Sequence, residues 1–475
     1  MAGTRTFLRF ACLSCLLLGI VRLNLPAQSQ QAGSTQLYLP VIRTNRSTWA
    51  FIYREAETPT DKQGYAIQPT RDRGYILAGG TNPTYAQVIK LDSQGEPAWA
   101  YNYGGNEGNE GALAVTQTQD GNYVVVGYTY SFGVGNSDGW VLKLDSGGQP
   151  LWQETFGWGL YDLFYDVKAT PDGGVMMVGA ATPSADQNID MWAIKLAADG
   201  ALQWQKTFHK GSWDNGTTLL LTPDGGYLLA GFTQATLVSQ RNAWLIQLDA
   251  DGNAIWDKTY GGSQWDLIQD IAMTTDGNYV IVGETSSFGA GSLDGWALKL
   301  TPDGVPIWQK AYGDSEQDAF NGITVLRDGS LIVAGEIGTS GFGQPDAWLM
   351  QLSDSGAIVW GEHLGSFGGD YMNDVQLVEE NLILTGASAS YSPGTLDTWA
   401  LKVDLFGRIP LCGLMISTDF RVADTQANIL SGNVVGQDWA IDPIASAAIP
   451  NDVNLQTILL CASDRAGLAS CLEQP

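Results

Sequence analysis

Three copies of an aromatic–acid pair stand 52 residues apart in the middle of the chain: Tyr161-Asp162, Trp213-Asp214 and Trp265-Asp266. An aromatic ring beside a carboxylate suits sugar recognition, because the ring stacks on the apolar face of a sugar and the acid accepts hydrogen bonds from its hydroxyls. The pairs therefore indicate a ligand-binding surface for a glycan. The alternative is that the rings pack over the rim of the fold and that each acid accepts N–H bonds within its own loop.

Acids occupy the same position in other parts of the chain, without an aromatic residue before them: Glu110, Asp318 and Asp370. A second series of acids recurs at a similar interval: Asp138, Asp190, Asp294, Asp346 and Asp397. Carboxylates that converge from several copies suit Ca²⁺, a hard cation that takes oxygen ligands. We therefore expect Ca²⁺ as the candidate cofactor, with Glu110, Asp318 and Asp370 as candidate metal ligands; the alternative is that each acid serves its own loop.

The acids belong to a repeat that runs through most of the chain. The stretch "TPDGGYLLAGF" (222–232) has close relatives at 118–128, 170–180, 274–284 and 326–336. A glycine near its end recurs seven times, at intervals of 48 to 52 residues: Gly79, Gly127, Gly179, Gly231, Gly283, Gly335 and Gly386. Two tryptophan series keep nearly the same interval, one from Trp49 to Trp360 and one from Trp140 to Trp399. Seven copies at one period indicate a repeat architecture.

Each copy reads as four short strands. In the fifth copy these are residues 268–275, 279–284, 295–300 and 305–312, with Asp-Gly turns after the first and third strands. The second and third strands are almost continuously apolar, as expected when both faces of a sheet are covered. Seven such sheets arranged radially cover one another, so the sequence predicts an all-β, seven-bladed β-propeller of four-stranded blades.

The ring of blades must also close. The seventh copy lacks its fourth strand, whereas an unpaired strand, "STWAFIYRE" (47–55), precedes the first copy. We expect this N-terminal strand to complete the last blade in a 3+1 closure that removes a free edge. In this topology the loops before the first and third strands of every blade share one face, so the aromatic–acid pairs and both acid series lie around one mouth of the central channel.

The segments outside the repeat have different roles. Residues 1–29 contain a basic start, a short apolar run and small residues at a cleavage position, which predicts a secretory signal peptide; a retained membrane anchor is the alternative. Residues 30–47 are a predicted linker, 48–411 the propeller and 412–475 a C-terminal extension that packs on the propeller or serves in docking. Export permits one disulfide among the three cysteines of this extension, and we expect Cys412–Cys461, with Cys471 left over.

The composition narrows the partners. The formal net charge is −26, from 50 Asp and Glu against 24 Lys and Arg, which makes nucleic acid and anionic membranes poor partners. We expect a secreted or cell-surface monomer without a transmembrane span in the mature chain. Its partner is expected to be an extracellular protein or a glycan.

The motifs "PDGGYLLAGF", "DGWALKLTPDG" and "IWDKTYGG" resemble those of a secreted bacterial seven-bladed β-propeller repeat family, over about residues 48–411. The resemblance implies the fold and says little about activity. The unit "LDADGNAIWDKTYGG" also looks like the tryptophan-docking repeat of quinoprotein dehydrogenases, but those enzymes have eight blades and dedicated cofactor ligands, so no site is carried over.

Signals of catalysis are sparse. His209 and His363 are the only histidines, and neither stands in a known catalytic motif. Paired carboxylates suit glycoside hydrolysis, but acids in every copy make such pairs easy to find. We expect a non-enzymatic binding scaffold. The alternatives are a hydrolase of the glycoside hydrolase type, with its acids at the channel mouth, and a purely structural surface module.

Overall fold

A computed structural model describes residues 46–409, except for short gaps at 56–59, 83–84, 106–107, 184–186, 236–239, 339–343, 366–367 and 393, and eight short strands between residues 415 and 471. All of these residues belong to one compact unit, Thr44–Pro475. The predicted signal peptide lies outside the described residues, as does most of the predicted linker. Among the residues described, none forms a helix that is long and apolar enough to cross a membrane.

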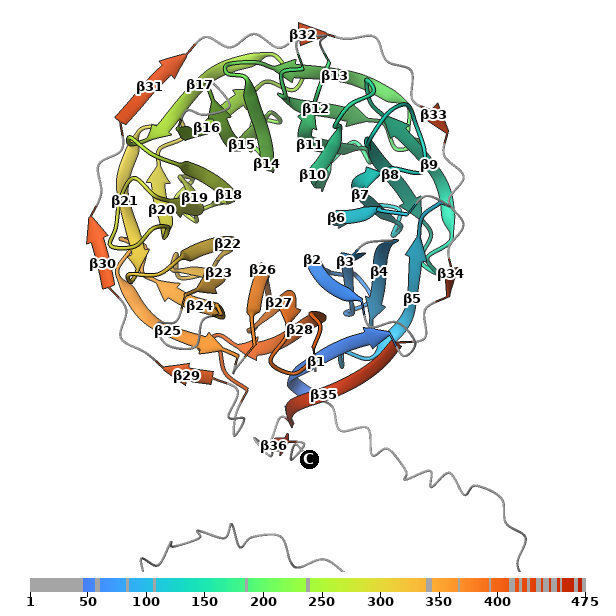
Figure 1. The fold of residues 1–475 in the computed structure, drawn as a ribbon, viewed down its shortest axis with the longest axis vertical. Coiled ribbons are helices and arrows are strands. Elements are labelled where there is room, and N and C mark those ends of the chain that lie inside the picture. The colour runs from blue at the N-terminus through green and yellow to red at the C-terminus, as the bar shows by residue number, and fades with distance from the viewer. Residues whose placement is uncertain are drawn as a thin grey trace, which may run out of the picture. The chain divides into compact units, whose positions relative to one another are not determined.

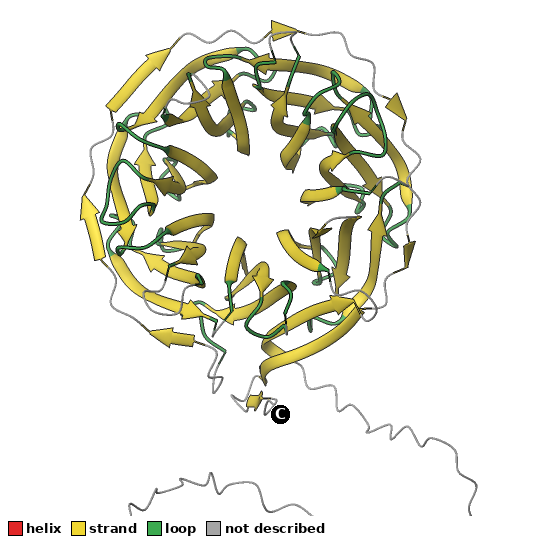
Figure 2. Cartoon of the chain, in the orientation of Figure 1, coloured by secondary structure: helices red, strands yellow, loops and turns green. Residues whose placement is uncertain are grey.

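The described chain folds into seven antiparallel sheets arranged radially in a ring (Figures 1 and 2). Blade one consists of β2 (Asp61–Pro69), β3 (Tyr75–Asn82), β4 (Tyr85–Leu91) and β5 (Pro97–Tyr103). Blade two consists of β6 (Gly111–Gln117), β7 (Tyr123–Thr129), β8 (Asp138–Leu144) and β9 (Pro150–Phe156). Blade three consists of β10 (Leu163–Ala169), β11 (Val175–Ala181), β12 (Asp190–Leu196) and β13 (Leu202–Phe208).

The same pattern continues around the ring. Blade four consists of β14 (Trp213–Leu221), β15 (Tyr227–Gln234), β16 (Arg241–Leu248) and β17 (Ala254–Gly261). Blade five consists of β18 (Asp266–Met273), β19 (Tyr279–Thr285), β20 (Asp294–Leu300) and β21 (Pro306–Gly313). Blade six consists of β22 (Asp318–Val325), β23 (Leu331–Ile337), β24 (Asp346–Leu352) and β25 (Ile358–Leu364). Blade seven begins with β26 (Asp370–Val378), β27 (Asn381–Ser388) and β28 (Asp397–Asp404).

The N-terminal strand completes blade seven, as the sequence predicts. Strand β1 (Arg46–Glu55) pairs antiparallel with β28, and Trp49 lies opposite Lys402. The seven-bladed, four-stranded architecture and its 3+1 closure are thereby confirmed. Because β1 precedes the first blade and β28 belongs to the last, their pairing ties the start of the ring to its end.

The repeated residues explain why the blades form and stack. The tryptophans of the third strands are fully buried between blades, and so is Trp49 of β1: Trp140, Trp192, Trp244, Trp296, Trp348 and Trp399. In the turn after β14, Gly225 has a φ of +87°, a backbone conformation that favours glycine. A side chain at Gly231, near the end of β15, would place its Cβ 1.9 Å from the carbonyl oxygen of Asn215. The glycine that ends the repeated phrase is therefore required by the close approach of the first two strands.

The C-terminal segment adds a fifth, outer strand to every blade. Counted from blade six backwards to blade one, the added strands are β29 (Met415–Ser417), β30 (Arg421–Asp424), β31 (Asn428–Gly432), β32 (Gln437–Asp438), β33 (Ile444–Ala445) and β34 (Asn451–Asp452). Strand β35 (Leu455–Asp464) then pairs with β1, and β36 (Ala469–Cys471) pairs with β35. Figure 1 shows these strands around the outside of the ring, in reverse blade order. We call them the outer belt.

Two of the three cysteines of the C-terminal extension lie in strands of the outer belt. The register of β35 and β36 places Cys461 opposite Cys471. Cys412, the expected partner of Cys461, lies outside the described residues.

Candidate functional site

An arginine and three aromatic rings form a cluster at the junction of blades four and five. The guanidinium carbon of Arg241 lies 4.6 Å from the ring centroid of each of three residues: Trp213, Phe232 and Trp265. Trp213 and Phe232 pack edge to face, with 5.8 Å between their centroids. The side chain of Trp265 is 49% exposed. A guanidinium packed against indole rings is a favourable cation–π arrangement. One of these indoles, that of Trp265, is also exposed to solvent.

We call these four residues the aromatic cluster. Most of them are positioned by the loops that lead into the first and third strands of the blades. Trp213 begins β14, Trp265 immediately precedes β18, and Arg241 begins β16. The Nε of Arg241 donates a hydrogen bond to Oε1 of Gln234, 3.0 Å away. Burial lowers the pKa of Arg241 and nearby Glu284 acts against this shift, but an arginine stays charged at neutral pH.

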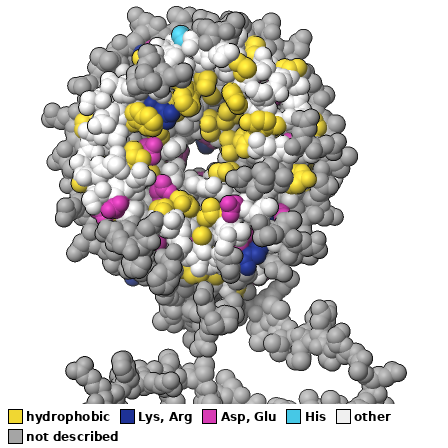
Figure 3. All heavy atoms as spheres, viewed as in Figure 1, with side chains coloured by type: hydrophobic (Ala, Val, Ile, Leu, Met, Phe, Trp, Pro, Cys, Tyr) yellow, Lys and Arg dark blue, Asp and Glu magenta, His cyan; other side chains and the backbone are white. Residues whose placement is uncertain are grey.

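Isolated backbone bridges show that these loops share one face. Ile189 directly precedes the third strand of blade three. It forms a bridge with Trp213, the first residue of the first strand of blade four. Ser137 bridges Tyr161 in the same way between blades two and three. Figure 3 shows hydrophobic side chains gathered around the central opening, with basic side chains beside them in one sector.

Tyr161 belongs to a different junction from the aromatic cluster. Its side chain is 51% exposed, like that of Trp265, but it lies between blades two and three. The extra aromatic residue of that loop, Trp158, packs on buried Trp192 with 5.0 Å between ring centroids. Of the three predicted aromatic residues, the structure thus brings Trp213 and Trp265 together.

The acids that follow these aromatic residues are buried. Asp162 accepts hydrogen bonds from the backbone N–H groups of Trp158, at 2.7 Å, and Thr182, at 2.8 Å. Asp214 accepts from the N–H groups of the loop before β14, and Asp266 from Gly262 and from the hydroxyl of Ser287. Burial raises the pKa of each of these carboxyls. Their bonds hold the loops that present the rings.

The three predicted metal ligands lie at three different blade junctions. Glu110 precedes β6, Asp318 begins β22 and Asp370 begins β26, and all three are buried. Asp318 accepts the N–H of Asp314 at 2.7 Å, and Asp370 accepts the hydroxyls of Ser388 and Ser390. Asp318 and Asp370 therefore support their own loops.

Acids of the two series meet across the junctions. A Cβ placed on Gly157 would lie 2.1 Å from Asp138 Oδ1 and 2.8 Å from Asp162 Oδ2, so both carboxyls face one point. Burial and the charge of Asp162 raise the pKa of Asp138 to about 7. Asp346 and Asp370 form a similar pair, and burial together with the charge of Asp370 raises the pKa of Asp346 to about 6. Such pairs hold a proton close to neutral pH.

A charged cluster lines the central channel, where a pocket of about 100 Å³ lies among the first strands of the blades. Lys168 Nζ lies 2.9 Å from Asp166 Oδ1, and the charges of Asp166, Asp270 and Asp374 raise the pKa of this lysine against the opposing effect of burial. The three acids stand in every second blade. We did not predict this cluster, although its spacing of 104 residues is visible in the sequence.

A second pocket, of about 210 Å³, opens between blades one and two. It is lined by two acids, Asp61 and Glu110, together with Lys62, Tyr65 and Tyr128. Oε2 of Glu110 is buried without a hydrogen-bond partner, and burial raises the pKa of its carboxyl. Glu110, one of the predicted metal ligands, thus lines a pocket.

Arg241 is a member of the aromatic cluster that was not predicted from the sequence. The other copies with a third-strand tryptophan carry uncharged residues at its position: Ser137, Ile189, Leu293, Pro345 and Leu396. The sequence feature that could have identified Arg241 is a single basic residue at a repeat position that is uncharged in these other copies.

The comparisons with known proteins identify no family. The chain matches no protein-family model and none of the curated proteins. A solved protein of unknown function from Bacteroides caccae is similar at 12% identity, over 64% of this chain and 93% of that chain, with a TM-score of 0.33. The polysaccharide lyase Uly1 is similar at 10% identity, over 78% of this chain and 94% of that chain, with a TM-score of 0.44.

A putative 6-phosphogluconolactonase from Bacteroides fragilis is similar at 10% identity, over 78% of this chain and 100% of that chain, with a TM-score of 0.37. Likeness at this level is a distant likeness of fold and carries no argument about activity. The resemblance of the repeat motifs to a secreted bacterial propeller family stays a prediction.

Proposed function

We propose that this protein is a non-enzymatic binding scaffold that recognises a glycan through its aromatic cluster. The observation that carries the proposal is the half-exposed indole of Trp265 beside the guanidinium of Arg241. The indole offers an apolar surface for a sugar ring, and a guanidinium carries five N–H donors for hydroxyl or carboxyl oxygens.

The site is held in place before any ligand arrives. The backbone N–H of Trp265 donates to Ser286 Oγ at 2.9 Å, and its carbonyl accepts the N–H of Ser286 at 2.7 Å. Arg241 is fixed by Gln234 on one side and by rings on its faces. Pre-organised groups lose little conformational entropy on binding, which favours recognition by a few side chains.

The proposed setting is extracellular, with the protein secreted or at the cell surface as a monomer and a glycan or glycoprotein as its partner. The acidic composition supports this choice of partner, because it disfavours polyanions. Ultracentrifugation of the purified protein and detection of the chain in culture medium test the two parts of this setting.

A glycan-array screen of the purified protein tests the function. Trp265→Ala is expected to abolish the binding of glycans that the unmodified protein retains. Tyr161→Ala is the matched control, because Tyr161 is equally exposed but lies at another blade junction. The absence of glycan binding by the unmodified protein, or equal effects of the two substitutions, contradicts the proposal.

A hydrolase of the glycoside hydrolase type is the second candidate, supported by the pocket that contains Asp61 and Glu110. A carboxyl whose pKa is raised suits a general acid, and a second carboxyl nearby is the partner that such chemistry needs. The test is release of reducing ends from oligosaccharides by the unmodified protein and by Glu110→Gln. Activity that Glu110→Gln lacks favours this candidate over a scaffold.

A further inference from the structure

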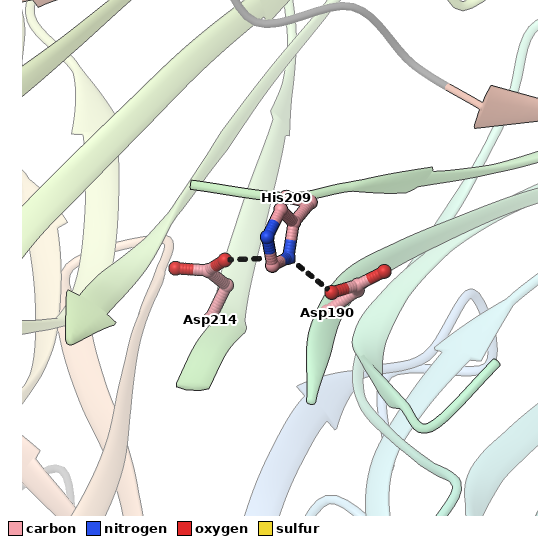
Figure 4. A group of neighbouring side chains, drawn as sticks. All are labelled: Asp190, His209 and Asp214. Carbon is pink, nitrogen blue, oxygen red and sulfur yellow. Dashed lines mark hydrogen bonds and ion pairs between the residues drawn. The ribbon is translucent and has the colours of Figure 1, made fainter. Parts of the chain in front are cut away.

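One blade junction carries a histidine between its two acids. Figure 4 shows Asp190 from β12, His209 from the segment after β13 and Asp214 from β14 pointing toward one another. Nδ1 of His209 lies 2.8 Å from Asp190 Oδ1 and 3.8 Å from Asp214 Oδ2. One ligand atom from each residue lies within 4.8 Å of the others. We propose that these residues bind a divalent transition metal of the Zn²⁺ class.

The repeat itself indicates that the histidine is not needed for folding. His209 stands five residues before Asp214. The residues five before Asp162, Asp266, Asp318 and Asp370 are all glycines: Gly157, Gly261, Gly313 and Gly365. A Cβ added to any of these glycines would lie within 2.6 Å of a carboxyl oxygen of an aspartate at the same junction. His209 is thus an exception at a position where neighbouring blades leave no room for a side chain.

The chemistry of the three ligands favours a transition metal over Ca²⁺. One imidazole nitrogen and two carboxylate oxygens form a three-ligand set that leaves a coordination position for water or substrate. Ca²⁺ takes six to eight oxygen ligands and no imidazole, so this set does not suit it. The side chain of His209 is 46% exposed, which gives a metal access from solvent, whereas both acids are buried.

The surroundings hold the ligands in place. Asp214 Oδ2 accepts the N–H of Lys210 at 2.6 Å and that of Gly211 at 2.8 Å, which fixes the carboxylate. The ammonium group of Lys210 pairs with Asp257 instead. This proposal is independent of glycan binding, because no member of the aromatic cluster is a ligand.

Zinc titration of the untagged, chelator-treated protein tests the proposal. We expect one equivalent of Zn²⁺ to bind, measured by calorimetry, and Co²⁺ to give a visible absorption band typical of nitrogen and oxygen ligands. His209→Gly restores the residue found at the other junctions and is expected to weaken Zn²⁺ binding at least tenfold. Circular dichroism and urea unfolding check its fold, and His209→Gln replaces it if it unfolds.

Asp294→Asn is the matched control. Asp294 occupies the position of Asp190 at another junction, where Gly313 stands in place of the histidine. This variant is expected to bind Zn²⁺ like the unmodified protein. Failure of the unmodified protein to bind Zn²⁺, or equal affinity in the folded His209 variant, overturns the proposal and leaves a histidine that is hydrogen-bonded to Asp190.

Discussion

Asp374 of blade seven accepts the backbone N–H of Ile67 of blade one at 2.8 Å, across the point where the ring closes. Asp166 does the same for Leu219 at 3.0 Å, and Asp270 for Ile323 at 2.9 Å. Each of these acids therefore links the innermost strand of one blade to that of the next. At ring closure this side-chain contact adds to the backbone pairing of β1 with β28.

Asp374→Ala is expected to destabilise the protein. Blades one and two carry Ala66 and Ala114 at the same register position, so the smaller side chain is compatible with the strand. The substitution leaves the buried N–H of Ile67 without its acceptor, which costs about 1–3 kcal/mol in the free energy of unfolding. Urea unfolding measures the loss, and an unchanged midpoint would show that the bond contributes nothing to closure.

The pair of Asp138 and Asp162 predicts a pH-dependent stability. The pKa of Asp138 is about 7 in the folded chain, from burial and the charge of Asp162, and about 3.9 in an unfolded chain. Between these values the folded state keeps a proton that the unfolded state has released. The contribution of this group to the free energy of unfolding is therefore full below about pH 4 and falls as the pH rises toward 7.

Asp138→Asn isolates this effect, because blade four already has Asn242 at the equivalent position. At pH 8 the variant is expected to be more stable than the unmodified protein by about 1–3 kcal/mol, and the difference is expected to vanish near pH 4. Urea unfolding at both pH values measures it. A stability difference that is the same at pH 4 and pH 8 would exclude the proposed titration.

The period of the repeat was sufficient to predict the blades and their closure, because burial between blades imposes the same pattern on every copy. Trp49 and its strand could be assigned to blade seven because one copy lacked that strand. The outer belt could not be predicted in this way. Its strands are as short as Gln437–Asp438, and they pair through backbone groups that every residue carries, so they need no repeated side chain.

The candidate site could be predicted only in part from the sequence. Sequence spacing located Trp213 and Trp265 on one face, but it did not distinguish an acid that faces solvent from one that caps its loop. Asp214 and Asp266 proved to be buried, because a carboxylate at a strand start meets several backbone N–H groups. Arg241 contacts the rings from a third loop, and only the fold brings that loop beside them.

Removal of the outer belt is expected to destabilise the ring and make it self-associate. A chain that ends at residue 411 keeps the β1–β28 closure but lacks the strands that cover the outer edge of each blade. Exposed strand edges pair with other chains. Thermal unfolding and light scattering measure the effect, and a truncated chain that stays monomeric with an unchanged Tm would show that the belt is dispensable.

The register of the last two strands predicts the disulfide. Cys461 and Cys471 are direct cross-strand partners, and such partners have Cα atoms close enough for a disulfide. We therefore now expect Cys461–Cys471 in place of the Cys412–Cys461 pairing inferred from the sequence. Peptide mapping of the purified, non-reduced protein by mass spectrometry identifies the pair, and a linked peptide that contains Cys412 would refute this assignment.

Arg241→Lys is expected to weaken glycan binding although it keeps the positive charge. Lysine lacks the planar guanidinium that packs against the rings of Trp213 and Trp265, and it cannot present the same fork of donors. We expect at least a tenfold loss of affinity for a glycan that binds the unmodified protein, equivalent to about 1.4 kcal/mol. Arg327→Lys, at an exposed ion pair with Glu380, is the control and is expected to leave the affinity unchanged. Equal affinities of Arg241→Lys and the unmodified protein, measured by calorimetry, would mean that charge alone matters at this position and that the stacked geometry does not contribute to recognition.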